Sequence, residues 1–239
     1  MMLAHHWHER FGTPLDELPG SSRWYRLPRH IPRLFHTHVL NEPASLRRLF
    51  GPRLAGRRPV LLLVRDPRDA LLSLHRHFRF RSRRTEWQRF GLGEDPGQLS
   101  LERFLRHPRI GLPAFLALYD RLAAFLDRHP RCLLLRYEDL RADPAASFAR
   151  LLGFLGEPTE PQAVARTVAF ASLEHMRALE AEGFFRSEVL RPADPAEGRS
   201  FKVGLGKSGR WREELPAELG AELAAMIGGR LDPRFGYGS

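Results

Sequence analysis

The sequence predicts an α/β protein with a mainly parallel sheet flanked by helices, because buried-strand patterns alternate with helical ones along the chain. Two mainly apolar runs, residues 59–64 and 132–137, have the length and composition of strands buried on both faces of a parallel sheet. The 239 residues suffice for one domain with a substantial core and are too few for two comfortable ones. Parallel sheets bind ligands at the carboxyl ends of their strands, so the residues directly after the two runs are the first candidates for a site.

The first apolar run leads into a turn with clear helix-start signals. Asp66 is the expected N-cap and Pro67 the expected first helical residue. Apolar side chains then recur at helical spacing, at Ala70, Leu71, Leu74 and Phe78. Residues 79–99 are polar and basic and contain three Gly and one Pro, which predicts a loop or a mobile lid.

The second half of the chain shows mainly helical patterns. Ser100 and Asp143 are expected to precede helices, and Gly156 is expected to close the second of them. Residues 183–212 show no periodicity and are predicted to be a long irregular segment. The expected helices span about residues 100–107, 113–128, 143–155, 160–169, 172–181 and 213–228.

The N-terminal part of the sequence is less regular. Residues 1–31 are rich in His, Pro and Gly and are expected to form an irregular segment, with the main domain at residues 32–239. Residues 33–38 are predicted to form a short extended segment.

The net charge of +10 raises the question of a nucleic-acid partner. Only two of the 38 basic residues are lysines, and this arginine bias, with abundant Ala, Gly, Pro and Leu, resembles the coding preference of a GC-rich genome. The basic residues are dispersed apart from residues 76–84, and nothing resembles a recognition helix, a zinc finger or an RNA-binding platform. We therefore expect no nucleic-acid partner, and an anionic small-molecule ligand accounts for part of the excess charge.

Other classes of protein are disfavoured by simple features. No apolar run reaches membrane-spanning length, and no signal peptide is indicated, so we expect no membrane span. The single cysteine, Cys132, allows no internal disulfide and indicates a cytoplasmic protein, and its apolar neighbours predict a buried residue rather than a reactive thiol. Eleven histidines include the tag-like group His5, His6 and His8, but no accompanying carboxylate or cysteine cluster predicts a metal site.

Four segments, in the right order, resemble motifs of the PAPS-dependent sulfotransferases. Residues 64–73, Val-Arg-Asp-Pro-Arg-Asp-Ala-Leu-Leu-Ser, resemble the family's 3′-phosphate-binding segment. Residues 134–140, Leu-Leu-Arg-Tyr-Glu-Asp-Leu, with the Asp-Pro and Leu-Gly elements downstream, resemble its RYEDL…DP…FLG segment. Residues 206–212 resemble its RKGxxGxW loop, and residues 32–38 resemble its PRxxKTH motif. The likeness spans roughly residues 32–238.

This resemblance implies a P-loop NTPase-like fold of the sulfotransferase type and specific residue roles. Arg65 and Ser73 would bind the 3′-phosphate of 3′-phosphoadenosine 5′-phosphosulfate (PAPS), and Tyr137 would lie near the adenine. Gly206 and Lys207 would belong to the loop that closes over this co-substrate. His38 would be the catalytic base that deprotonates a hydroxyl or amine of a small-molecule or glycan acceptor, without a metal.

Elementary physics supports part of this assignment, because a helix N-terminus attracts anions and arginine offers two parallel donors to a phosphate. Simpler interpretations stay open. Arg65 could be a solvated arginine, Ser73 a small residue for helix–sheet packing, and Tyr137 an anchor at a strand end.

The sequence departs from the family pattern in three places. Family members begin with a strand and a PKSGTTW-like loop that cradles the 5′-phosphosulfate, whereas the first lysine here is Lys202, so we expect the fold to be N-terminally incomplete. His36 replaces the lysine of the KTH motif. The Arg-Lys of the RKG motif falls on Gly204 and Leu205, which leaves Lys207 and Lys202 as possible substitutes.

Three hypotheses follow from the departures. The chain could be a sulfotransferase whose true start lies upstream. It could be a degenerate, non-catalytic relative that retains partial nucleotide binding. It could also be a binding protein completed by a partner that supplies the missing strand.

Overall fold

A computed structural model describes residues 1–17, 19, 24–34, 58–82, 87–88, 91–186, 201–204 and 206–238. The chain forms two compact units, each built from two separate stretches of sequence. The first unit comprises Met1–Thr37 and Ala142–Gly206, and the second comprises His38–Arg141 and Lys207–Ser239. The predicted boundary between a leading segment and a main domain at residue 32 concerns a different division and stays a prediction.

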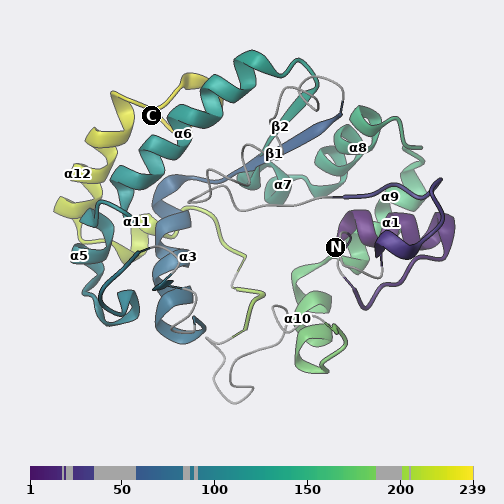
Figure 1. Cartoon of the computed structure of the whole chain (residues 1–239), viewed down its shortest axis with the longest axis horizontal. Helices are drawn as coiled ribbons and strands as arrows, with labels where there is room; N and C mark the ends of the chain where they lie inside the picture. Colours follow the sequence, from purple (N-terminus) through teal and green to yellow (C-terminus); the bar gives the residue numbers. More distant parts are fainter. Residues whose placement is uncertain are drawn as a thin grey trace. The chain divides into compact units, whose positions relative to one another are not determined.

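The second unit contains the two predicted strands, which pair in parallel as a two-stranded sheet within the described residues (Figure 1). Strand β1 is Val60–Val64 and strand β2 is Cys132–Arg136. Their register places Val64 opposite Arg136, so both strands end at the same edge. Arg65 follows β1 and Tyr137 follows β2, so these two residues lie next to each other at that edge of the sheet.

Helix α3 (Pro67–Phe80) starts directly after β1, as the sequence predicted. The Asp66 side chain accepts a hydrogen bond from the backbone N–H of Arg68, and Pro67 occupies the first turn. Leu71 and Phe78 are almost completely buried, at 0% and 3% exposure, so this face anchors the helix in the core. The start of α3, which carries the site described below, is thereby fixed by both its cap and its packing.

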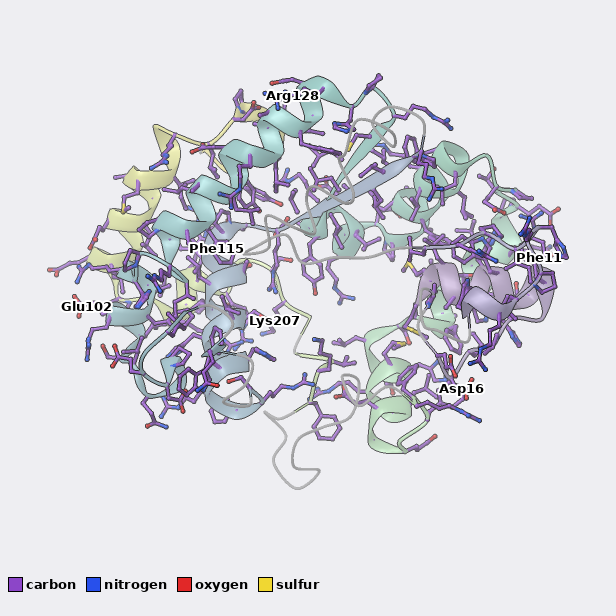
Figure 2. The ribbon with its side chains drawn as sticks, in the orientation of Figure 1. Phe11, Asp16, Glu102, Phe115, Arg128 and Lys207 are labelled. Carbon is purple, nitrogen blue, oxygen red and sulfur yellow. The ribbon has the colours of Figure 1, made fainter. Side chains whose placement is uncertain are left out.

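The core of the second unit lies between α3, α6 (Leu112–Arg128) and α12 (Ala217–Gly228). Phe115 of α6 is one of its buried side chains (Figure 2). Shorter elements complete the unit, namely η2 (Pro96–Gln98), α5 (Leu101–Arg106), α7 (Tyr137–Ala142, whose last residue belongs to the other unit), α11 (Trp211–Glu214) and η5 (Pro233–Phe235).

Two of these elements differ from the sequence prediction. The single helix expected at 213–228 is two helices, α11 and α12, because Pro216 lacks the N–H that a continuous helix needs. Strand β2 ends at Arg136, one residue before its predicted end, because the helical turn α7 begins at Tyr137 without an intervening loop. Cys132, expected to be buried, is partly exposed at the start of β2, and burial still raises the pKa of its thiol.

The first unit is helical in its described part. Its elements are α1 (Met2–Phe11), η1 (Trp24–Arg26), α8 (Pro144–Leu155), α9 (Pro161–Phe170) and α10 (Leu173–Ala181). Helices α8, α9 and α10 begin and end within a residue or two of their predicted bounds. Asp143 and Gly156 cap α8 as expected, Gly156 with a φ of 74° in the left-handed region.

Helix α1 was not predicted, because the expectation for residues 1–31 was an irregular segment. The expectation was wrong for these ten residues, since Ala4 and Trp7 are buried at 0% and 3% exposure on one face. The His5 ring stacks on Phe170 of α9 with 4.4 Å between ring centroids. The many histidines of this segment made its amphipathic pattern hard to recognise in the sequence, although one face of the helix is buried. No helix within the described ranges is long and apolar enough to cross a membrane.

Candidate functional site

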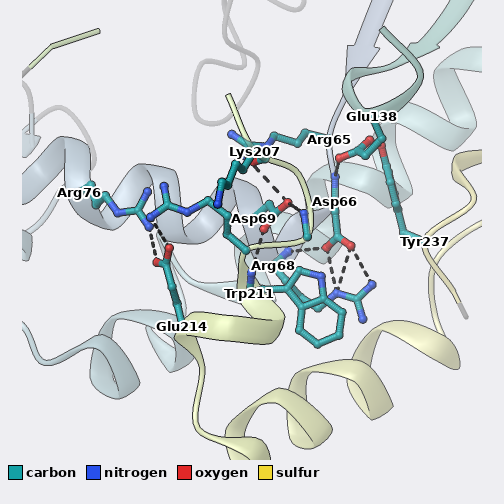
Figure 3. A network of polar contacts seen from close by, with 12 residues as sticks. Arg65, Asp66, Arg68, Asp69, Arg76, Glu138, Lys207, Trp211, Glu214 and Tyr237 are labelled. Carbon is teal, nitrogen blue, oxygen red and sulfur yellow. Dashed lines mark hydrogen bonds and ion pairs between the residues drawn. The ribbon is translucent and has the colours of Figure 1, made fainter. Parts of the chain in front are cut away.

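Arg65, the residue that follows β1, meets two of the other predicted site residues. Its guanidinium carbon lies 4.6 Å from the centroid of the Tyr137 ring, which follows β2. Its Nη2 donates a hydrogen bond of 3.4 Å to the backbone oxygen of Lys207 (Figure 3). The fold therefore brings together Arg65, Tyr137 and Lys207, which are at least 70 positions apart from one another in the sequence.

The Arg65 guanidinium retains capacity to bind an anion. Asp69 is the carboxylate paired with it, and the shortest separation, from Nη2 to Oδ2, is 4.0 Å, which is too long for a hydrogen bond. The Nε atom is buried and has no hydrogen-bond partner within the described part of the chain. Burial without a partner is costly for such a donor, so an acceptor supplied by a ligand would stabilise this arrangement.

The backbone of Arg65 is fixed by a buried tyrosine. Its N–H donates to the Tyr119 hydroxyl oxygen over 3.3 Å, and that hydroxyl in turn donates to the Arg65 carbonyl oxygen. Burial raises the pKa of Tyr119, so the hydroxyl keeps its proton over the physiological range. This pair of bonds orients the turn from which the arginine side chain projects.

The remaining predicted site residues are placed less tightly. Ser73 is exposed on α3, a little over two helical turns after Arg65. Gly206 precedes Lys207 and has a φ of 64°, a left-handed conformation that favours glycine. His38, the predicted base, lies outside the described residues, as does most of the 33–38 segment.

A buried ion pair supports the start of α3 beneath Arg65. The Arg68 guanidinium binds the Asp66 carboxylate through two nitrogens, at 2.9 Å from Nε to Oδ1 and 2.8 Å from Nη2 to Oδ2 (Figure 3). The same guanidinium lies 3.9 Å from the centroid of the Trp211 ring. Asp66 therefore caps the helix, neutralises Arg68 and, through it, contacts the C-terminal loop.

Glu138 links the two strand ends on the other side. Its Oε1 accepts the backbone N–H of Asp66 at 3.0 Å, and its Oε2 accepts the Tyr237 hydroxyl at 2.6 Å. Burial, followed by the bond to Glu138, raises the pKa of Tyr237. The Arg136 guanidinium lies 4.8 Å from the Tyr237 ring centroid. Glu138 lies in the 134–140 motif, but the family resemblance implied no role for it.

Asp69 is a further residue of the site for which the sequence predicted no role. Its side chain is fully buried, and it accepts the backbone N–H groups of Gly209 at 2.6 Å and Trp211 at 3.1 Å (Figure 3). The only sequence signal for Asp69 was its place as an acidic residue in the first turn of a predicted helix. Acidic residues are common at that position in helices that bind no loop, so this signal does not indicate a contact with residues 209 and 211.

Carboxylates neutralise other arginines around the site. Glu214 forms ion pairs with both Arg76 and Arg210. Together with the Asp66–Arg68 pair, these contacts leave Arg65 and the exposed Lys207 among the described cations at this edge that have no close carboxylate partner and could meet a ligand. Within the part of the chain that the structure describes, no group of three or more His, Cys, Asp or Glu side chains could hold a metal ion.

The fold and the site define a class of protein: an α/β chain with parallel strands and an arginine at a strand-to-helix turn. The family model of the sulfotransferase domain matches residues 28–232, and the chain belongs to this family. Cytosolic sulfotransferase 16 of Arabidopsis thaliana is 29% identical over 201 residues, which cover 81% of this chain and 55% of that protein. Sulfotransferase 2B1 of Homo sapiens is 26% identical over 194 residues, covering 80% of this chain and 48% of that protein. The chain thus spans about half the length of the curated relatives it matches.

Two solved structures have a fold similar to that of this chain. A retinol dehydratase in complex with androsterone and the inactive cofactor PAP superposes with a TM-score of 0.61 at 21% identity, covering 89% of this chain and 57% of that one. A mouse sulfotransferase complexed with PAP gives a TM-score of 0.51 at 15% identity, covering 72% of this chain and 58% of that one. The predicted sulfotransferase-type fold is confirmed.

Proposed function

We propose that the chain acts as a sulfotransferase that uses PAPS as co-substrate and a hydroxyl or amine as acceptor. The observation that carries the proposal is the position of Arg65, stacked on Tyr137 and bonded to the Lys207 backbone, with a buried Nε that lacks a partner within the described residues. An arginine held in this way at a helix start is suited to a phosphate.

The described residues fit a 3′-phosphoadenosine group in three respects. Arg65 offers donors for the 3′-phosphate, and Ser73, exposed on the following helix α3, offers a hydroxyl. The Tyr137 ring offers an apolar face for the adenine. Lys207, preceded by the left-handed Gly206, offers a cation from the C-terminal loop. Family membership and neighbours solved with PAP support this assignment.

In the proposed reaction, the acceptor oxygen or nitrogen bonds to sulfur while the bond from sulfur to the bridging phosphate oxygen breaks. The electron pair leaves with 3′,5′-phosphoadenosine, and His38 takes the acceptor proton. Histidine suits this role because its ordinary pKa lies near neutrality. No metal is needed. Cations near the departing phosphate would stabilise its developing charge, which is a role for Lys207.

The acceptor is proposed to be a small molecule or a glycan. Retinol and androsterone, named with the neighbouring retinol dehydratase, are small molecules that carry a hydroxyl group. The name of the cytosolic relative from Arabidopsis supports a cytoplasmic location for this chain as well.

A second candidate function is nucleotide binding without turnover. It is favoured by one observation, that the sequence has no lysine before Lys202 to serve the 5′-phosphosulfate. The two functions share the site around Arg65 and differ in whether sulfuryl transfer follows binding.

Calorimetry with 3′,5′-phosphoadenosine tests the shared site. The chain is expected to bind in the micromolar range, and Arg65→Ala is expected to lose binding. Arg103→Ala is a matched control, since Arg103 is an arginine of the same unit with a side chain that is 70% exposed. Absence of binding by well-folded wild-type protein would sink both candidates. Binding without transfer to any of a panel of phenols, alcohols and amines would favour the second.

A further inference from the structure

Asp69 contacts both parts of the proposed site from a fully buried position. Its Oδ2 accepts the Gly209 N–H, its Oδ1 accepts the Trp211 N–H, and its Oδ2 lies 4.0 Å from Nη2 of Arg65 (Figure 3). Arg65 in turn donates to the backbone oxygen of Lys207. One carboxylate thus connects the arginine after β1 with the segment that carries the lysine.

The chemistry of a buried carboxylate makes this connection a firm one. An ionised carboxylate away from water is stable only if its oxygens accept hydrogen bonds or meet a cation. Asp69 has 0% side-chain exposure, and its hydrogen bonds in the described structure come from the two loop N–H groups. Hydrogen bonds to a charged acceptor are stronger than neutral ones, so displacement of the loop would be costly.

The loop backbone is shaped to deliver both N–H groups to Asp69. Gly209 has a φ of 78°, in the left-handed region, and a β-carbon there would lie 3.0 Å from Nη1 of Arg212. This conformation turns the chain so that residues 209 and 211 face the same carboxylate, one oxygen each.

We propose that Asp69 is a positioning residue that ties the Lys207–Trp211 segment to the start of α3 and so sets the distance between Arg65 and Lys207. The expected consequence, a higher affinity for the nucleotide, rests on the proposed function. The tie itself is a property of the free protein and can be measured without a ligand.

A second carboxylate in the other unit provides a matched control. Glu180 of α10 is 1% exposed and accepts the backbone N–H groups of Lys202 at 2.5 Å and Val203 at 2.7 Å. Like Asp69, it is a buried carboxylate in which each oxygen accepts one backbone N–H group. It binds a different part of the chain, residues 202 and 203.

Proteolysis at the two lysines of the chain can report on the contacts of both carboxylates. The chain contains two lysines. Lys202 belongs to the segment that Glu180 binds, and Lys207 lies two residues before Gly209, which Asp69 binds. A lysine-specific protease therefore cuts the chain at two bonds. Cleavage after Lys202 gives fragments 1–202 and 203–239, and cleavage after Lys207 gives fragments 1–207 and 208–239.

The experiment compares initial cleavage rates at the two bonds in nucleotide-free wild type, Asp69→Asn and Glu180→Gln under native conditions. An amide in place of the carboxylate accepts at only one atom, so each variant loses about one charge-assisted bond. We expect Asp69→Asn to speed cleavage after Lys207 by about tenfold or more, with cleavage after Lys202 little changed. Glu180→Gln is expected to show the reverse pattern.

Two outcomes would overturn the proposal. The first is unchanged cleavage after Lys207 in Asp69→Asn. The second is equal acceleration at both bonds in that variant, which would reveal a general loss of stability. Gly209→Ala covers the case in which Asp69→Asn does not fold. This variant strains the left-handed backbone at residue 209, which donates to Asp69, and leaves the carboxylate intact. It is expected to accelerate cleavage after Lys207 selectively, and uniform acceleration would count against the tie.

A binding arm separates this inference from the proposed function. If wild type binds 3′,5′-phosphoadenosine, Asp69→Asn is expected to weaken that binding by about tenfold or more, and unchanged affinity would remove the link between the tie and the site. If wild type does not bind, the proposed function fails while the cleavage pattern still decides whether Asp69 ties the loop.

Discussion

Tyr237 donates its hydroxyl hydrogen to Oε2 of Glu138 over 2.6 Å, and this bond attaches the C-terminal end of the chain to the turn after β2. The other oxygen of Glu138 accepts the N–H of Asp66, the cap of α3. A single carboxylate thus connects both strand ends and the C-terminal segment beside the proposed nucleotide site.

Removing the Tyr237 hydroxyl tests this connection. Tyr237→Phe is expected to lower the free energy of unfolding by about 1–3 kcal/mol, because the partly buried Glu138 carboxylate loses a hydrogen-bond donor. Urea denaturation measures the change, and a double-mutant cycle with Glu138→Gln isolates the pair. Strictly additive effects of the two changes would contradict the assigned bond.

Alkaline pH is expected to destabilise the protein through its buried tyrosines. The pKa of Tyr119 and that of Tyr237 are both raised, in each case chiefly by burial. Their contribution to stability is fully present below the unfolded tyrosine pKa of about 10 and is lost as the pH rises above it. Phenolate absorbance should show fewer than the 4 tyrosines ionising before the protein unfolds. Ionisation of all of them in folded protein would refute the packing of these two.

The Asp66–Arg68 pair is expected to matter far more than a surface pair. Arg68→Ala leaves a buried carboxylate without its cation and should cost about 3–5 kcal/mol of unfolding free energy. Arg230→Ala is the matched control, because Arg230 and Asp120 form an ion pair at 3.0 Å that is about half exposed. The control should cost about 0–1 kcal/mol, and thermal or urea unfolding compares the two. Similar losses in both variants would contradict the assigned burial.

Mild acid is expected to reduce stability through His75. Burial lowers the pKa of His75, whose ring nitrogen Nε2 lies 3.2 Å from the Leu99 carbonyl oxygen. As the pH falls below the unfolded histidine value of about 6.5, the unfolded chain binds a proton more readily than the folded one, so the free energy of unfolding falls. His75→Gln should reduce the slope of stability against pH between about 7 and 5. A slope identical to wild type would show that other groups cause it.

Lysine substitutions decide which lysine serves the proposed site. Lys207→Ala should weaken 3′,5′-phosphoadenosine binding by about tenfold and reduce its salt dependence, because Lys207 lies next to Arg65 in the fold. Lys202→Ala should bind like wild type. Calorimetry at two salt concentrations measures both, and a larger loss for Lys202→Ala would reverse the assignment.

The sequence predicted the two strands and most helices because their signals are local. The apolar run at residues 60–64 and the Asp-Pro start of α3 need no knowledge of distant residues. Where prediction failed, the local signal was ambiguous. Histidines hid the buried face of α1, and the turn from β2 into α7 depends on packing at the strand end.

The candidate site was found only in part, for the same reason. Motif likeness singled out Arg65, Tyr137 and Lys207, and the fold brings these three together. Neither spacing nor composition could reveal that Asp69 binds residues 209 and 211, or that Glu138 binds Tyr237. His38 stays a prediction, since it lies outside the described residues.

By itself, the sequence determined which residues could form strands, caps and an anion-binding turn, because these depend on neighbours a few positions away. Only the tertiary structure decided which carboxylates are buried and what they accept. Asp69 and Gly209 are 140 positions apart, and their 2.6 Å bond exists because β1, α3 and the C-terminal loop pack at one sheet edge. Long-range pairing of this kind depends on the whole core, and no local pattern encodes it.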